Sequence, residues 1–328
     1  MKNAWKVVVI SIILGIALMI VGFMSGARSG VSFGRGGVIL GEMPLRDVPH
    51  TIASHFGLHN DHNDRIPHDA WQTSGARSSV MLSDEITSIN INVVSANIEF
   101  VVSDNFMLEI IDNNQAGAPI RYAIDGSVLE ITQGTGRNRW SFGFGFTPAS
   151  RITVFVPRDM EFDMVNARTV SGRIDMESVD CRGRLIVSTV SGGITLNNST
   201  AESMSINATS GIVRINNATA DDMAISVISG RTEADRIRAS GLNVDSISGS
   251  VTIRGELTGQ TRIDTTSGAV HLTVQTNGER YQKDLSVLSG NINVNGQRVQ
   301  GRSFSNMEHS DNRISINALS GSIHLNME

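Results

Sequence analysis

Short runs of alternating apolar and polar residues begin near residue 79 and continue to the end of the chain. The first runs are SININVVSANIEFVV, FMLEII, SVLEIT and RITVFVP, which lie between residues 88 and 157. Alternation with period two is typical of β-strands with one buried face. Asp125-Gly126 stands between two such runs and is a signal for a tight hairpin turn. We therefore predict an N-terminal β region over residues 79–168.

From residue 169 the same alternation is organised by a recurring Ser-Gly pair. Successive pairs are 20, 19, 19, 19, 19, 22 and 31 residues apart. Apolar residues recur three and five positions after each serine, and in the coils of nineteen again at thirteen and fifteen. Side chains two residues apart share one face of a strand, so each period supplies two short strands. The pairs are Ser171 and Gly172, Ser191 and Gly192, Ser210 and Gly211, Ser229 and Gly230, Ser248 and Gly249, Ser267 and Gly268, Ser289 and Gly290, and Ser320 and Gly321.

A fixed period of about twenty residues is typical of stacked repeat architectures. We predict an all-β fold, a single-stranded, β-helix-like solenoid with coils of about 19–20 residues over residues 169–328. Each Ser-Gly pair is interpreted as a structural corner, because glycine tolerates positive φ and close backbone approach. A catalytic serine is not predicted, since no acid–base partner recurs with it.

The N-terminus predicts a membrane attachment. Residues 1–6 contain two lysines and are predicted to be cytoplasmic, and residues 7–24 carry no charge. Eighteen helical residues span about 27 Å, close to the thickness of a bilayer core. We predict a single-pass transmembrane helix with the C-terminal domain outside the cytoplasm. The alternative is a signal peptide cleaved after Ser25-Gly26-Ala27, which would release a secreted protein.

Residues 25–75 are predicted to be a flexible, histidine-containing tether. Its first part is rich in glycine, and His55, His59 and His62 would share one face if the segment were helical. Imidazole groups in that arrangement are plausible ligands for Zn²⁺ or Ni²⁺. Gly57 and the lack of a helix-forming run argue against a preformed site, so no metal site is predicted, with metal binding as the alternative.

The charge and the cysteine content bear on which classes of function the chain can have. The net charge of −5 does not support nucleic-acid binding, and the single cysteine excludes an intrachain disulfide. No cofactor is predicted. The segment RNRWSFGFGFTP alternates Trp140, Phe142, Phe144 and Phe146 with small residues. These aromatics either cover the start of the solenoid core or form an apolar patch for a protein or glycan partner.

The order of RITVFVP, a short link and TVSGRIDM, followed by further SG-x-apolar-x-apolar segments, resembles bacterial β-strand-repeat proteins known as putative adhesins, of unknown function. The resemblance covers roughly residues 79–328. It implies an envelope-associated β-solenoid, sometimes linked to envelope-stress signalling, and brings no catalytic residues. Members often have Asp after the glycine. This chain has none there, which weakens a cation site at the corners.

These observations predict a non-enzymatic surface-binding, adhesion or display module that contacts the cell membrane through its N-terminal helix. The alternative is an accessory regulator of envelope-stress sensing that acts through a membrane partner. The third interpretation is a polysaccharide-active enzyme, which would need acids and bases on one face. Instead, the carboxylates of the repeat fall at different positions within their coils. Among them are Asp175, Asp221, Asp222, Glu233, Asp235, Asp245 and Asp264.

The sequence stops within a repeat, at SGSIHLNME. A solenoid that ends on an unpaired strand offers free backbone groups to another chain. We therefore predict self-association or partner docking through the C-terminal edge.

Overall fold

The structure is a computed structural model that describes residues 29–34, 37–42, 66–67, 70–113, 119–133, 149–276, 279–306 and 309–328. The chain divides into two compact units, Met1–Asp61 and His62–Glu328. In the first unit, β1 (Ser29–Gly34) pairs antiparallel with β2 (Gly37–Glu42), so the predicted tether contains a hairpin. The predicted membrane segment, residues 7–24, lies outside the described residues. Within the part of the chain that the structure describes, no helix is long and apolar enough to cross a bilayer.

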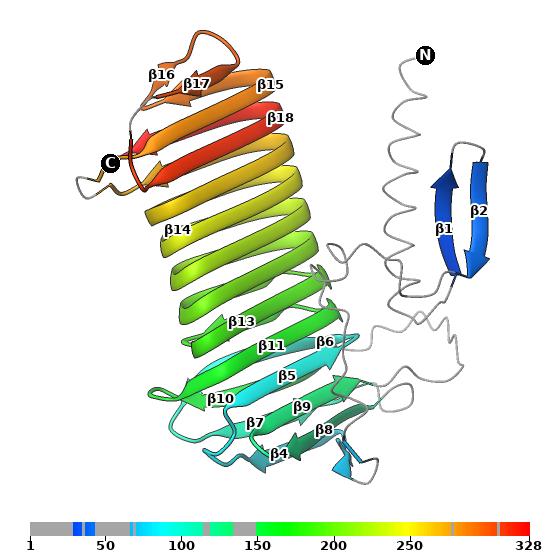
Figure 1. Ribbon diagram of the computed structural model, residues 1–328. Helices are drawn as coiled ribbons and strands as arrows, with labels where there is room; N and C mark the ends of the chain where they lie inside the picture. The colour runs from blue at the N-terminus through cyan, green and yellow to red at the C-terminus, as the bar shows by residue number, and fades with distance from the viewer. Residues whose placement is uncertain are drawn as a thin grey trace. The chain divides into compact units, whose positions relative to one another are not determined.

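The second unit is an all-β solenoid whose coils are stacked one above another (Figure 1). Each coil has two walls. We call the segment after a Ser-Gly pair wall A and the segment before the next pair wall B. The strands of the first coils are β11 (Glu161–Ser171), β12 (Ile174–Glu177) and β13 (Asp180–Ser191), and β14 (Ile194–Val274) winds continuously through the middle coils. Neighbouring coils pair in parallel, as the repeat predicted.

The solenoid begins before the first Ser-Gly pair. Strands β5 (Ser88–Val93) and β6 (Ala96–Ser103) pair in parallel with β11 and β12, so the region predicted at residues 79–168 shares its walls with the repeat. Wall B continues into β9 (Val128–Gln133), β8 (Ile120–Asp125) and β3 (Gln72–Thr73). Wall A continues into β10 (Ser150–Pro157), β7 (Met107–Ile111) and β4 (Arg77–Met81).

The predicted hairpin at Asp125-Gly126 is confirmed, with a shift of one residue. Strands β8 and β9 pair antiparallel, and Asp125 is itself the last paired residue of β8, opposite Val128. The turn residues are therefore Gly126 and Ser127. Gly126 has φ of 57°, a conformation that glycine adopts without steric cost.

The core is a ladder of aliphatic side chains between the two walls. The residues three and five positions after each serine are buried in wall A, among them Ile194, Leu196, Val213 and Ile215, except Val294, which is half-buried. The second predicted set, including Met204 and Ile206, is buried in wall B. The coil that begins at Ser229 has Thr232 and Ala234 at the wall A positions, and both are buried as well. The alternation of the sequence thus predicted the inward-facing positions.

The Ser-Gly corner is set by close backbone contact between coils. From Gly192 onward, the corner glycines have φ between 140° and 153°. A Cβ built on Gly192 would lie 1.9 Å from the carbonyl oxygen of Gly172, and one on Gly211 would lie 1.7 Å from that of Gly192. No real Cβ fits at such distances. The eight corner serines are all exposed.

A second corner lies seven residues after each of the first four serines, and it was not predicted from the sequence. Ser178, Asn198, Asn217 and Arg236 occupy this position with φ of 50–53°. The left-handed region is uncommon for residues other than glycine, with Asn and Asp the usual exceptions. None of the four residues is glycine and only two are asparagine, so the residue types do not mark this corner in the sequence.

The last two coils do not stack in sequence order. Strand β18 (Arg313–Met327) pairs in parallel with β14 on one side and with β15 (Gln282–Val294) on the other. Ser320 accordingly lies between Ser267 and Ser289. Figure 1 shows the red β18 between the yellow and orange ribbons. The irregular intervals of 22 and 31 residues arise from this insertion.

The prediction of an open edge at the C-terminal segment was therefore wrong. β18 has a strand partner on each side, and the outer strand is β15. β15 is itself covered in part by β16 (Gln297–Arg298) and β17 (Ser303–Ser305), which pair antiparallel with it. Short antiparallel segments of this kind protect a sheet edge.

Alanine substitutions at two adjacent glycines test the close backbone contact at the corner. Gly192→Ala should destabilise the solenoid by about 3 kcal/mol or more, because the new Cβ collides with backbone at a strained φ. Gly193→Ala is the matched control, since its Cβ would have its nearest contact at 3.5 Å. Urea unfolding of both variants measures the difference. Equal stabilities would contradict the corner geometry.

Engineered disulfides test the order of the last coils. Neighbouring strands lie about 4.8 Å apart, within the Cα separation that a disulfide bridges, whereas next-nearest strands lie about 10 Å apart. The pair Ser267→Cys with Ser320→Cys should form a disulfide under mild oxidation, and Ser267→Cys with Ser289→Cys should not. Mass spectrometry of the oxidised proteins gives the result. Crosslinking of the second pair alone would restore sequence-order stacking.

Candidate binding faces of the solenoid

Outward-facing side chains form columns, because corresponding residues of successive coils are paired in register. On wall A the columns lie four and six positions after each corner serine. On wall B they lie three and one positions before it. A column repeats one chemical position about every 4.8 Å, so each wall presents rows of similar or complementary groups.

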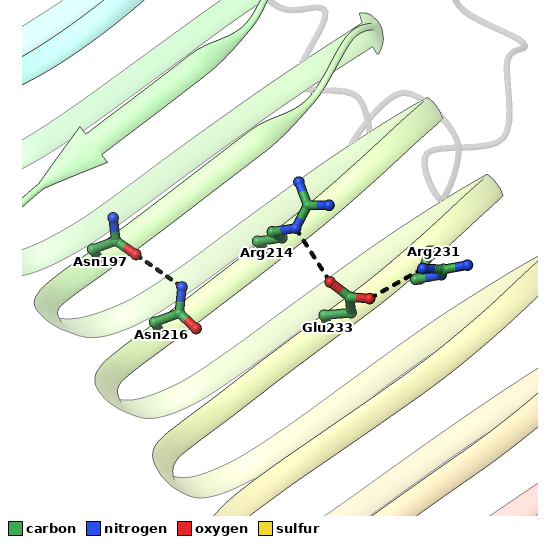
Figure 2. A network of polar contacts seen from close by, with 5 residues as sticks. All are labelled: Asn197, Arg214, Asn216, Arg231 and Glu233. Carbon is green, nitrogen blue, oxygen red and sulfur yellow. Dashed lines mark hydrogen bonds and ion pairs between the residues drawn. The ribbon is translucent and has the colours of Figure 1, made fainter.

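Wall A carries a charged network, shown in Figure 2. Arg214 Nε lies 3.2 Å from Glu233 Oε2, and Arg231 Nη1 lies 3.4 Å from Glu233 Oε1. All three side chains are exposed. Exposed ion pairs of this kind contribute about 0–1 kcal/mol each, so the network orders the surface more than it stabilises the fold.

Next to it runs an amide ladder that ends at Glu177. Asn216 Nδ2 donates to Asn197 Oδ1 at 2.9 Å (Figure 2), and Asn197 Nδ2 donates to Glu177 Oε2 at 3.1 Å. The corner residues Asn217 and Asn198 form a parallel ladder, with Asn217 Nδ2 2.7 Å from Asn198 Oδ1. Asn198 and Asn217 begin N-glycosylation patterns in the sequence, and here both serve as corner residues.

Two histidines stack at the far end of wall A. The rings of His271 and His324 have centroids 4.6 Å apart and planes inclined by 11°. Asn293 Nδ2 lies 3.2 Å from Nδ1 of His324. Burial, together with the neighbouring His271, lowers the pKa of His324. The neutral imidazole is therefore favoured in the folded state.

Wall B carries a surface groove of about 420 Å³. Four adjacent coils line it, and we call it the wall B groove. Its polar ridge is the column of Asp245, Asp264, Asn317 and Ser286. Its apolar ridge is the column of Ile247, Thr266, Leu319 and Leu288, in which the polar Thr266 separates Ile247 from Leu319. The order along each ridge follows from the insertion of β18, so residues far apart in sequence become neighbours.

A smaller hollow of about 300 Å³ lies on wall A. Arg214 and Glu233 flank it on one side and His271 on the other, with Thr252 between them. Its walls are charged and carry no exposed large aliphatic group. The two faces therefore differ in chemistry, and only the wall B groove combines polar and apolar ridges.

Two buried ionisable groups lie apart from these faces. Burial raises the pKa of Glu130 to about 7, while a hydrogen bond from Asn90 Nδ2 at 2.7 Å opposes the shift and Asp125 adds to it. Burial likewise raises the pKa of the Cys181 thiol to about 12, so the thiol stays protonated at neutral pH. Cys181 is a core residue without the thiolate character that a nucleophile needs.

The predicted chemistry of the N-terminal half falls on residues that the structure does not describe. These are His55, His59 and His62 of the tether and the aromatic residues Trp140, Phe142, Phe144 and Phe146. Among the described residues, no three His, Cys, Asp or Glu side chains gather closely enough to hold a metal ion.

The family is set by a match along most of the solenoid. The model of the Toastrack DUF4097 family matches residues 86–326. The chain belongs to this family. The match begins two residues before β5 and ends within β18, so it includes the inserted coil. The resemblance to bacterial β-strand-repeat proteins is thereby confirmed. Among curated proteins, none matches the chain.

Several solved structures are similar to this Toastrack protein. A putative adhesin from Bacteroides fragilis is 16% identical, with 76% of this chain and 95% of that chain covered and a TM-score of 0.44. A putative adhesin from Parabacteroides distasonis is 13% identical, with 77% and 96% covered and a TM-score of 0.39. A putative cell adhesion protein from Clostridium sporogenes is 13% identical, with 78% and 100% covered and a TM-score of 0.23.

The repeat pattern alone did not predict the wall B groove. Large aliphatic residues stand directly before the serine at Ile228, Ile247, Leu288 and Leu319, and only the last three line the groove. The sequence does not show which of these residues become neighbours, because that depends on the position of β18 in the sheet. The groove thus depends both on the repeated coils and on the insertion of β18 between β14 and β15.

The histidine stack predicts a pH effect on stability. The pKa of His324 is lower in the folded state, so the unfolded chain takes up this proton first as pH falls. The contribution of His324 to the free energy of unfolding is fully present above about pH 6.5. It is lost as the pH falls from there through the folded-state pKa. His324→Gln should therefore lose less stability than the parent between pH 7.5 and pH 5.

Urea unfolding across that pH range measures the effect. The buried Glu130 titrates in the opposite sense, so the comparison is between variant and parent rather than between two pH values alone. His309→Gln is the matched control, because His309 is exposed. A His324→Gln profile that superimposes on the parent profile would show that the stack has no such role.

Proposed function

We propose that this Toastrack protein is a non-enzymatic binding module that uses the outer face of wall B for adhesion or display at the cell envelope. The observation that carries the proposal is the apolar ridge of the wall B groove. Ile247, Leu319 and Leu288 are 53%, 52% and 58% exposed. Single exposed aliphatic residues are common, but an aligned row beside a polar ridge is typical of an interaction site.

The rigidity of the solenoid supports binding over catalysis. Strand pairing holds the backbone at these positions, so little backbone entropy is lost when a partner docks. The carboxylates of the repeat are spread over both walls and engaged with neighbours, such as Glu233 with Arg214 and Asp264 with Arg262. An enzyme would instead need an acid and a base that converge on one substrate position.

Attachment to the membrane completes the proposal. The uncharged segment 7–24 follows two lysines and is long enough for a bilayer span. A solenoid held at the membrane by this segment would present its walls outside the cytoplasm. Secretion after signal cleavage is the alternative, and N-terminal sequencing of the mature protein separates the two.

Removal of the apolar ridge tests the binding function. The double variant Leu288→Ser, Leu319→Ser should weaken retention of the full-length protein on glycan arrays and intact cells by about 10- to 100-fold, as expected when two central aliphatic contacts are lost. Ile212→Ser is the control, because Ile212 is exposed on wall A. Unchanged retention of the double variant would exclude wall B as the binding face. Cleavage of an arrayed polysaccharide would replace the proposal with an enzymatic function.

A further inference from the structure

The sheet of the solenoid is covered at one end and open at the other. At one end, β16 and β17 pair with the outer strand β15 and cover part of its edge. At the other end, the sheet terminates in β3 on wall B and in β4 on wall A, which lies at the lower end of the stack in Figure 1. β4 pairs with β7 on one side, and among the described residues no strand pairs with its other side. β4 thus has an open edge of five residues, whereas β3 has only two.

Two backbone hydrogen bonds show which residues of β4 face β7. The amide of Leu82 donates to the carbonyl of Phe106 at 2.9 Å, and the amide of Asp112 donates to the carbonyl of Ala76 at 3.1 Å. Both bonds involve even-numbered residues on the β4 side, and hydrogen-bonded positions alternate along an antiparallel ladder. The even-numbered residues of β4 therefore bond to β7. The odd-numbered residues direct their N–H and C=O groups toward the open edge.

The open residues are symmetric about the middle of the strand. They are Arg77, Ser79 and Met81, with Ser79 at the centre. When a second copy of β4 lies antiparallel with Ser79 opposite Ser79, Arg77 of each copy lies opposite Met81 of the other. Every open N–H and C=O group of both strands then has a partner. Self-complementarity of this kind is the property that a two-fold interface between identical chains requires, so it favours a second copy over an unrelated strand.

The side chains of the open residues suit this pairing. Ser79, which would lie at the two-fold axis, is small and uncharged. Met81 is 64% exposed and would lie beside the aliphatic stem of Arg77 of the second copy. The guanidinium of Arg77 stays paired with Glu109, at 2.6 Å from Nη2 to Oε1. The two arginines would be offset by four residues, about 14 Å along the strands, which exceeds the Debye length of about 8 Å at physiological ionic strength.

The hydrophobic core is also open at this end. Ile124 lies opposite the fully buried Leu129, so its side chain is on the core side of wall B, yet it is 46% exposed. Val80 lies opposite the buried Leu108 on wall A and is half-buried. The corresponding core-side residues of the middle coils are buried. Solenoids usually close such an end with a polar capping repeat, and a second molecule placed end to end would serve instead.

We propose that the protein forms a two-fold symmetric dimer in which the β4 strands of two copies pair antiparallel around Ser79. The pairing joins the two A walls into one continuous sheet and closes the open end of each core. It goes beyond the proposed binding function, because it uses neither ridge of the wall B groove. The dimer would present two wall B faces to one surface, which raises avidity without new contacts.

Single cysteines test the register in the full-length protein. Residues of a hydrogen-bonded antiparallel pair have Cα atoms about 5.5 Å apart, within the range that a disulfide bridges. Ser79→Cys should therefore give a disulfide-linked dimer under mild oxidation. Met81→Cys is the matched control, because it lies on the same face of β4 but about 14 Å along the strands from its counterpart. The native Cys181 is buried and leaves the result unaffected.

Removal of one open N–H tests the association itself. Proline is tolerated in an edge strand where its nitrogen faces outward, so Ser79→Pro removes this donor and keeps the ladder between β4 and β7. Sedimentation velocity from about 1 to 100 μM should show dimerisation weakened at least tenfold. Ser79→Thr is the control, because it keeps the N–H and should dimerise like the parent. Urea unfolding establishes that each variant is folded.

Three results would overturn the inference. Equal crosslinking of Ser79→Cys and Met81→Cys would show random collision, and a parent protein that stays monomeric up to about 100 μM would show an edge that does not pair. Association that Ser79→Pro leaves unchanged would belong to another part of the chain. Should Ser79→Pro fail to fold, the cysteine pair decides alone. Cell-surface retention through wall B is measured separately, so the failure of one proposal does not imply the failure of the other.

Discussion

The close contact between backbones at the Ser-Gly corner is the constraint on which the solenoid depends. Each corner glycine from Gly192 onward lies so near a glycine carbonyl of the preceding coil in the stack that no side-chain carbon fits between them. This contact brings successive coils to strand spacing and keeps them in register. Register in turn buries the aliphatic ladder on the inside, because a shift by one residue would turn that ladder toward water.

The same register organises the outside of the molecule. Residues that occupy equivalent places in successive coils become columns, and neighbouring members bond to one another. The ladder from Asn216 through Asn197 to Glu177 and the network around Glu233 on wall A are examples. A solenoid therefore converts a weak sequence repeat into rows of aligned groups. Binding to an extended partner is the use to which such rows are best suited.

The insertion of β18 decides which side chains are neighbours at one end of wall B. The insertion of β18 between β14 and β15 places Leu319 beside Leu288 and Asn317 beside Ser286. It also removes the open edge that sequence order would have left, since β16 and β17 cover part of β15. One rearrangement of strand order thus protects the end of the sheet and builds the groove.

The sequence by itself determined the repeat, the all-β class, the inward-facing residues and the place of the Ser-Gly corners. These properties are local, because alternation with period two and the conformational freedom of glycine act within a few residues. The corner at Asn198 and Asn217, the order of the last coils and the groove were decided only by the tertiary structure. These three features arise from pairing between strands that are distant in sequence. The loops that join β14, β15 and β18 do not determine which strands pair. The pattern before Ser248, Ser289 and Ser320 supplied the side chains, and the strand order made them a surface.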